Sequence, residues 1–214
     1  MDAEGLRDGS SVLDAGCGPG GTACFLQACG LRCTGVDWHP GEGREVPARD
    51  AVLPPEGVPA FVSADLHSLP FAAGVFDACF AECVLSLVKD PEAVLAELCR
   101  VLRPEGLLLV TDLTLRRGAV PDRPSPASGF LVRGGSCLAG AVTSGMWKDR
   151  FETAGFGVLR AEDHSRELAA LMAQLVWHDA AQNLAWLMPG GCSSGASSDR
   201  RSYGYGLFLA RRRG

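Results

Sequence analysis

Short apolar runs alternate with segments of helical periodicity along most of the chain. The runs hold four to eight residues and are bounded by turn-forming or acidic residues, a pattern typical of strands. They predict strands at 11–14, 32–37, 60–64, 75–81, 107–113, 156–161 and 203–210. Apolar residues at helical spacing predict helices at 22–29, 91–102, 144–154 and 165–188.

The order of these elements predicts an α/β fold class. The run at 107–113 is apolar almost throughout, as expected for a central parallel strand buried on both faces. The last run, 203–210, alternates in character and is expected to lie antiparallel to the others. Together they predict a doubly wound, Rossmann-like, mostly parallel sheet with a C-terminal antiparallel strand.

Residues with capping preferences mark the ends of the predicted helices. Asp90 precedes Pro91, which combines an N-cap residue with a proline in the first turn. Thr143 is placed to cap the helix that follows it, and Gly30 stands just after the end of the first helix. Residues 103–106 are expected to form the turn before the strand at 107–113.

Three segments interrupt the regular pattern. Residues 40–58, 114–136 and 189–202 are rich in proline, glycine or serine and are predicted to be loop or lid insertions. Within the first of them we expect at most a turn or two of helix, between 43 and 52. We find no internal repeat and no second domain, so residues 1–214 are interpreted as a single domain.

Length and charge narrow the class of protein. A chain of 214 residues is long enough for one well-buried domain. Its net charge of −5 does not favour nucleic-acid binding. No apolar run reaches the roughly 18 residues of a membrane span, and residues 1–5 do not resemble a signal peptide. We expect a cytoplasmic protein with no membrane or nucleic-acid partner, while the oligomeric state stays open.

The nine cysteines are scattered and odd in number, which favours reduced thiols over a disulfide framework. Unpaired cysteine packs like a small apolar residue. We expect this packing role for Cys24, Cys29, Cys33, Cys79 and Cys99.

A glycine-rich turn follows the first strand. Residues 12–21 read Val-Leu-Asp-Ala-Gly-Cys-Gly-Pro-Gly-Gly, so that a strand, a tight turn and a helix N-terminus succeed one another. Such a turn lets backbone N–H groups approach a ligand closely. The glycine spacing satisfies both the dinucleotide fingerprint and that of S-adenosylmethionine (SAM). Asp14 favours the second, because a carboxylate repels phosphate but suits a ligand that carries a cation.

This stretch as a whole resembles the first motif of class I SAM-dependent methyltransferases. The resemblance implies SAM as cofactor and a class I methyltransferase fold. It implies that Gly16, Gly18 and Gly20 hold the methionine end of the cofactor. It also places Asp14 near the amino group and the sulfonium.

Further along, four more positions fit the same cofactor. Asp37 lies sixteen residues after Gly21, near the distance at which βαβ folds place a carboxylate on ribose hydroxyls. By the resemblance, Trp38 is expected against adenine. Residues 63–71 resemble the family's third motif, which assigns Asp65 and Leu66 to the adenine site.

The region after the fourth strand carries the candidate catalytic residues, Glu82 and Cys83. Glu82 is expected either as a general base or as a contact of the cofactor's methionine end. Residues 82–90 resemble the same region of arsenite methyltransferases, and so do residues 136–142. The resemblance implies that Cys83 and Cys137 bind trivalent arsenic, and thiolates suit such a soft centre. The family's further cysteine upstream of the first motif has no counterpart here, and Glu82 stands where the family has asparagine.

These features predict methyl transfer from SAM to a small acceptor, either a trivalent metalloid or a thiol-bound species, without a metal cofactor. An O-, N- or C-methyltransferase of a small metabolite, as in quinone biosynthesis, remains an alternative. A SAM- or nucleotide-binding module without catalysis is another. A nicotinamide dehydrogenase is a third, which Asp14 opposes.

Overall fold

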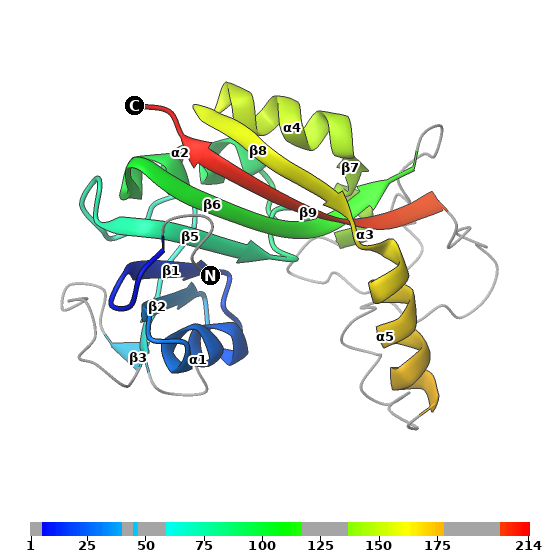
Figure 1. The fold of residues 1–214 in the computed structure, drawn as a ribbon, viewed down its shortest axis with the longest axis horizontal. Helices are drawn as coiled ribbons and strands as arrows, with labels where there is room; N and C mark the ends of the chain where they lie inside the picture. Colours follow the sequence, from blue (N-terminus) through cyan, green and yellow to red (C-terminus); the bar gives the residue numbers. More distant parts are fainter. Residues whose placement is uncertain (1–5, 40–44, 47–58, 117–136, 178–201) are drawn as a thin grey trace.

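Figure 1 shows the computed structural model, which describes residues 6–39, 45–46, 59–116, 137–177 and 202–214. One mixed sheet runs through the described part, in the order β3-β4-β2-β1-β5-β6-β9-β8, with β7 paired to β6. Its strands are β1 (Ser11–Ala15), β2 (Arg32–Asp37), β3 (Glu45–Val46), β4 (Ala60–Ser63), β5 (Phe76–Glu82), β6 (Leu102–Leu115), β7 (Val142–Thr143), β8 (Phe156–Asp163) and β9 (Tyr203–Arg212).

The strand directions confirm the predicted fold class. β9 pairs antiparallel with β6 and with β8, while every other ladder of the described sheet is parallel. β8 therefore points the same way as the central strands. The carboxyl ends of β1, β2, β5, β6 and β8 share one edge of the sheet, and β9 starts at that edge.

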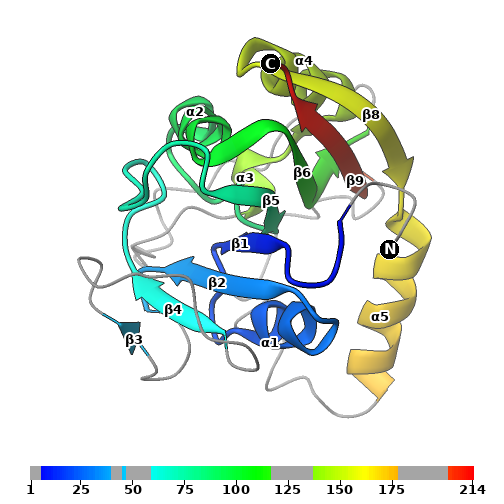
Figure 2. The same ribbon diagram turned by 60° about the vertical axis from the view of Figure 1, so that its left-hand side comes forward.

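Helices cover both faces of the sheet. α2 (Pro91–Val101) and α4 (Ser144–Thr153) lie on one face and α1 (Gly21–Ala28) lies on the other, as Figures 1 and 2 show. Neighbouring strand residues alternate between two apolar clusters. Leu13 and Leu108 join the cluster under α2 and α4, whereas Val12 and Leu107 join the cluster under α1. This alternation is the physical basis of the apolar runs in the sequence.

Two helix caps agree with the sequence prediction. The Asp90 side chain accepts a hydrogen bond of 2.9 Å from the Ala93 N–H, and Pro91 is the first residue of α2. The Thr143 hydroxyl accepts one of 3.2 Å from the Met146 N–H at the start of α4.

The predicted turn at 103–106 is wrong in its position, because β6 begins at Leu102, directly after α2. Phe76 pairs with Leu102 and Ala78 pairs with Leu107, so β6 advances five residues while β5 advances two. The surplus residues form a bulge in which Glu105 has a φ of 64°. The turn-forming residues therefore bend a strand instead of ending a helix.

Other differences concern short elements. Residues 45–46 form a strand where we expected loop or a turn of helix, and α3 (Cys137–Gly140) and β7 were not predicted. β6 extends to Leu115, into the predicted loop at 114–136. α5 (Ser165–Trp177) is described only to Trp177, so the predicted helix end at 188 lies outside the described residues. So do residues 117–136, 189–201 and most of 40–58.

None of the helices that the structure describes is long and apolar enough to cross a membrane.

Replacing Gly20 by alanine is predicted to lower the free energy of unfolding by about 2–4 kcal/mol. Gly20 has a φ of 89°, and a Cβ there would lie 2.4 Å from Cζ of the buried Phe61 ring. Urea unfolding followed by circular dichroism measures the loss. Gly21→Ala is the matched control, because nothing lies within 4 Å of its Cβ position. The control should change stability by less than about 1 kcal/mol. Equal losses for both variants would contradict this account of the turn.

Candidate active site

The sheet reverses its strand order between β1 and β5. From β1 the chain builds outward through β2 and β4, and later through β5 and β6 on the other side. In open α/β sheets, ligands bind beyond the carboxyl ends of the strands at this switch point. Asp14 lies near the end of β1, Glu82 ends β5 and Asp37 ends β2. Three acidic residues thus stand at the edge where a ligand is expected.

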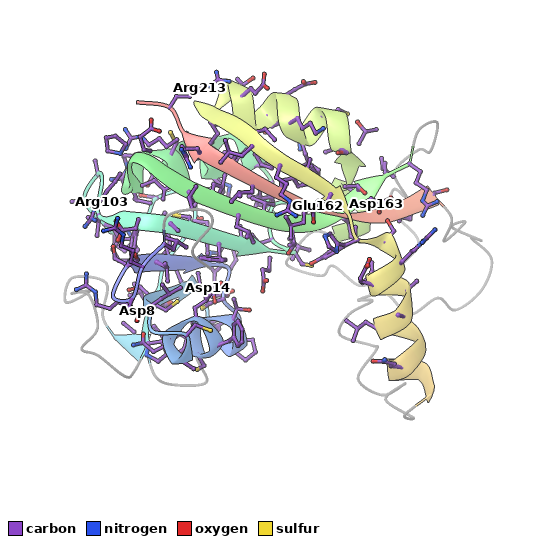
Figure 3. All side chains as sticks on the ribbon, in the orientation of Figure 1. Asp8, Asp14, Arg103, Glu162, Asp163 and Arg213 are labelled. Atoms are coloured by element: carbon purple, nitrogen blue, oxygen red, sulfur yellow. The ribbon has the colours of Figure 1, made fainter. Side chains whose placement is uncertain are left out.

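Asp14 is the buried member of this group, with only 2% of its surface exposed. Within the described part of the chain, its Oδ2 atom has no hydrogen-bond partner. Burial raises the pKa of Asp14 to about 7, and the nearby charges of Glu82 and Asp37 add to this effect, against a hydrogen bond from the Ala23 backbone. In Figure 3, Asp14 lies on β1, on the side of the sheet where α1 lies. A cationic ligand group would relieve this environment.

The glycine-rich turn is fastened to the end of β2. The Gly16 and Cys17 N–H groups both donate to the Val36 carbonyl, at 2.7 and 3.1 Å. The Gly18 N–H donates to Oδ2 of Asp37 at 3.0 Å. The backbone of the turn is thereby held beside the carboxylates of the switch point.

The three glycines at 16, 18 and 20 all have positive φ, but their surroundings differ. A Cβ at position 16 would lie 2.4 Å from Cγ2 of Val84, so this glycine permits close packing. A Cβ at position 18 would meet nothing within 4 Å. Gly18 is therefore the residue whose missing side chain leaves open space, which is what a ligand lying on the turn requires.

Glu82 connects the two sides of the switch point. The Thr22 hydroxyl, in the first turn of α1, donates a hydrogen bond of 2.6 Å to Oε2 of Glu82. The Glu82 side chain is exposed, and its negative charge helps to raise the pKa of Asp14. Glu82 therefore lies beside the Asp14 site while also facing outward at the end of β5.

Cys83 follows directly, in a left-handed backbone conformation with a φ of 53°. Its N–H donates to the Thr111 carbonyl at 2.8 Å. Its Sγ atom lies 3.2 Å from the Tyr205 hydroxyl, which donates in turn to Oγ1 of Thr111 at 2.9 Å. Residues of β6 and β9 therefore contact the exposed Cys83, which directly follows β5.

A family model for a methyltransferase domain matches residues 13–110, which span β1 to the middle of β6 and include the switch point. The malonyl-[acyl-carrier protein] O-methyltransferase of Pseudescherichia vulneris is 32% identical over 118 residues, 55% of this chain and 44% of that protein. The demethylmenaquinone methyltransferase of Beutenbergia cavernae is 36% identical over 114 residues, 53% of this chain and 45% of that protein. The chain thus spans about half the length of these relatives.

Among solved structures, a Haemonchus contortus phosphoethanolamine N-methyltransferase in complex with S-adenosylhomocysteine superposes with a TM-score of 0.68. It covers 98% of this chain and 50% of that protein at 16% identity. At this identity the likeness concerns the fold, and the strand order and the family match agree with it.

Residues 13–110 match a methyltransferase domain, and the described sheet has the fold of class I methyltransferases. The prediction of this SAM-dependent class is confirmed, whereas the narrower resemblance to arsenite methyltransferases stays a prediction.

The residues predicted for the cofactor gather at one edge of the sheet. Besides those described, Trp38 follows β2 and is 60% exposed, and its backbone carbonyl accepts a hydrogen bond from the Ser63 hydroxyl. Asp65 is exposed, and hydrogen bonds from the His67 backbone and ring lower its pKa. The Leu66 side chain is buried in the core, so only its main chain is available for a ligand.

The loop after Cys83 is anchored by a residue that the sequence did not single out. Asp112 is fully buried on β6 and accepts hydrogen bonds from the Ser86 N–H at 2.9 Å and from the Ser86 hydroxyl at 2.6 Å. Burial raises the pKa of Asp112. Tyr205 was also missed, because its contact with Cys83 depends on the register between β6 and β9, which the pattern of residues does not specify.

The segment of Cys137 packs against this loop. Gly140, which ends α3, lies so close that a Cβ on it would be 1.9 Å from the Ser86 carbonyl oxygen. The structure thus brings the helix that begins at Cys137 to the loop that begins at Cys83. The Cys137 side chain lies outside the described part of the structure. No group of three or more metal-ligating side chains occurs among the described residues.

One cysteine departs from the expected packing role. Cys33 and Cys79 are buried, and burial raises the pKa of each thiol. Cys29 and Cys99 are half-buried. The prediction is wrong for Cys24, which is exposed, because α1 buries only the face that carries Ala23 and Leu26.

Asp14→Asn is predicted to stabilise the ligand-free domain at alkaline pH. In the folded wild type the Asp14 pKa is about 7 instead of 3.8, so folding takes up a proton between these values. Wild-type stability therefore falls as pH rises through this window, and the asparagine variant escapes that fall. Urea unfolding should show the advantage of the variant growing by roughly 2–3 kcal/mol between pH 5 and pH 8. A constant difference would contradict the burial argument.

Proposed function

We propose that this chain binds SAM across the β1–β5 switch point and transfers its methyl group to a small acceptor beside Glu82 and Cys83. One observation carries the proposal. The Asp14 carboxyl group is buried at the switch point, has an oxygen without a partner and lies near two further carboxylates. These features favour a ligand with a cation and oppose a dinucleotide, whose phosphates would be repelled there.

Each end of SAM has suitable residues along this edge. Asp14 is assigned to the cationic methionine end, and the open position at Gly18 gives the ligand room to lie on the turn. Asp37 is assigned to the ribose hydroxyls, and Trp38 and Asp65 to the adenine. When bound, SAM supplies an electrophilic methyl group, whose transfer leaves S-adenosylhomocysteine.

The protein side of the reaction consists mainly of positioning. The glycine turn and α1 hold the methyl donor at β1, while Glu82 and Cys83 border the space toward β6 and β9. The exposed Glu82 carboxylate, held in place by the hydrogen bond from the Thr22 hydroxyl, is suited to accept a proton or a hydrogen bond from an N–H group of the acceptor. Close alignment of acceptor and methyl carbon is expected to supply most of the acceleration.

The acceptor is proposed only as a small molecule. The relatives described above methylate, by their names, a malonyl-[acyl-carrier protein] and a demethylmenaquinone. They share only about half of their length with this chain, so an oxygen, nitrogen or carbon atom of a small metabolite is the broad candidate. We also propose a cytoplasmic location, in keeping with a freely diffusing acceptor.

A trivalent metalloid is the second candidate acceptor. The exposed thiol of Cys83 stands at the end of β5, and the helix that begins at Cys137 packs against the loop that Cys83 begins. Two thiolates from these positions would suit arsenic(III).

SAM binding is predicted to strengthen with pH up to about 7 and then to level off. A cation at Asp14 favours the ionised carboxylate, so below its pKa the ligand must displace a proton. Isothermal titration should give a dissociation constant that rises about tenfold for each unit of pH below 7.

Asp14→Asn should weaken SAM binding at pH 8 by at least about tenfold, while Asp90→Asn, an exposed helix cap at which asparagine serves equally well, should leave it unchanged. Absence of SAM binding at any pH would overturn the proposed function. Binding without turnover of any acceptor would point to a SAM-binding module.

Arsenite separates the two acceptor candidates. With SAM-saturated, reduced protein, the metalloid hypothesis predicts an arsenite-dependent heat that is lost in Cys83→Ser and in Cys137→Ser but kept in Cys24→Ser, which alters an exposed thiol on α1. The same heat in all variants, or no heat in the wild type, would exclude the metalloid role and leave a small metabolite as acceptor.

A further inference from the structure

Tyr205 lies on β9, the antiparallel strand of the sheet. Its hydroxyl group is at the edge where the parallel strands have their carboxyl ends. β9 starts at this edge, and its Tyr205 pairs with Leu113 of β6. The side chain is half-buried, and its hydroxyl lies between Thr111 and Cys83. The phenol therefore stands on the β5–β6 side of the switch point, away from Asp37 and the glycine turn.

Thr111 and Tyr205 both contact Cys83, one at its backbone and the other at its side chain. The Thr111 carbonyl accepts its N–H, and the Tyr205 hydroxyl contacts its Sγ at 3.2 Å. A left-handed backbone is costly for a residue with a Cβ, so these contacts select a conformation that cysteine would not adopt by itself. The thiol is thereby directed to the exposed side of the edge, next to Glu82.

The phenol has the chemistry to remain a hydrogen-bond donor here. Among the described residues, the titratable groups that act on it are the Cys83 thiol and the Glu82 carboxylate. Burial raises the pKa of Tyr205, and negative charge on Cys83 or Glu82 raises it further, so the hydroxyl keeps its proton. It donates to Thr111 while the thiol is neutral, and it can turn toward Sγ once the thiol has lost its proton.

We propose that Tyr205 is a positioning residue of the acceptor subsite, where its hydroxyl orients the Cys83 sulfur toward the methyl donor and stabilises that sulfur as a thiolate. The proposal rests on the proposed function, because it takes the space beside Glu82 and Cys83 as the acceptor side of bound SAM. Removal of this one hydroxyl should therefore alter the chemistry of Cys83 while leaving the cofactor side, at Asp14 and Gly18, unaffected.

The test is the pH profile of Cys83 alkylation by iodoacetamide, followed by peptide mass spectrometry on the full-length reduced protein. In Tyr205→Phe the midpoint of the profile should rise by about one unit, with a five- to tenfold slower reaction at neutral pH, because the thiolate loses a charge-assisted hydrogen bond. The exposed Cys24 on α1 is the control within the same sample and should keep its profile.

Thr111→Val distinguishes positioning from general disruption. Without Oγ1 of Thr111, the phenol keeps its contact with Cys83, so the midpoint should stay or fall. A rise of the same size in both variants, or an unchanged profile in Tyr205→Phe, would overturn the proposal.

Protection by SAM tests whether Cys83 lies beside the bound cofactor. Saturating SAM should slow the alkylation of Cys83 in the wild type by at least threefold, and Tyr205→Phe should bind SAM within twofold of the wild type. An alkylation rate that SAM leaves unchanged would overturn the placement of Cys83 in the acceptor subsite. Failure of the proposed function would appear separately, as the absence of SAM binding in the wild-type titration.

Discussion

The Asp14 carboxyl group is buried at the end of β1, and one of its oxygens has no hydrogen-bond partner among the described residues. An arrangement of this kind costs free energy in the ligand-free protein. The surrounding structure keeps the carboxylate in place, because β1 is enclosed by β2 and β5 and lies on the core cluster under α1. The ligand-free fold thus keeps a carboxyl group in an unfavourable environment, at a point where a cationic ligand would stabilise it.

The rest of the edge is arranged around that residue. N–H groups of the glycine turn donate hydrogen bonds to the Val36 carbonyl and to the Asp37 carboxylate, which fixes the backbone beside Asp14. Thr22 reaches across the switch point to Glu82. Beyond Glu82, buried Asp112 fastens Ser86 and so sets the path of the chain that starts at Cys83. The part of the edge proposed for the methyl donor therefore depends on backbone geometry, whereas the part proposed for the acceptor depends on side-chain contacts from three strands.

This division explains how much the sequence alone could predict. Local patterns specify the apolar strands, the helix caps at Asp90 and Thr143, and the turn at 16–20, because each depends on residues close together in the chain. The carboxyl ends of parallel strands meet at one edge, so Asp14, Asp37 and Glu82 could also be placed together from topology.

The parts that sequence reasoning missed depend on long-range register. The contact of Tyr205 with Cys83 needs the pairing of β9 with β6, and the role of Asp112 needs the path of the loop at Ser86. The bulge near Glu105 arises where two strands of unequal length pair, which no local pattern specifies. Cys24 was predicted to pack in the core because unpaired cysteine is usually buried, but it lies on the exposed face of α1.

The most direct test of the account is a carbon-13 NMR titration of the Asp14 side-chain carboxyl, assigned by comparison with Asp14→Asn. The account predicts a midpoint near pH 7 in the free protein, and a carboxylate that stays ionised to far lower pH once SAM is bound. A midpoint near the ordinary value of about 4 in the free protein would contradict it, since Asp14 would then have no unfavourable environment for a cation to relieve.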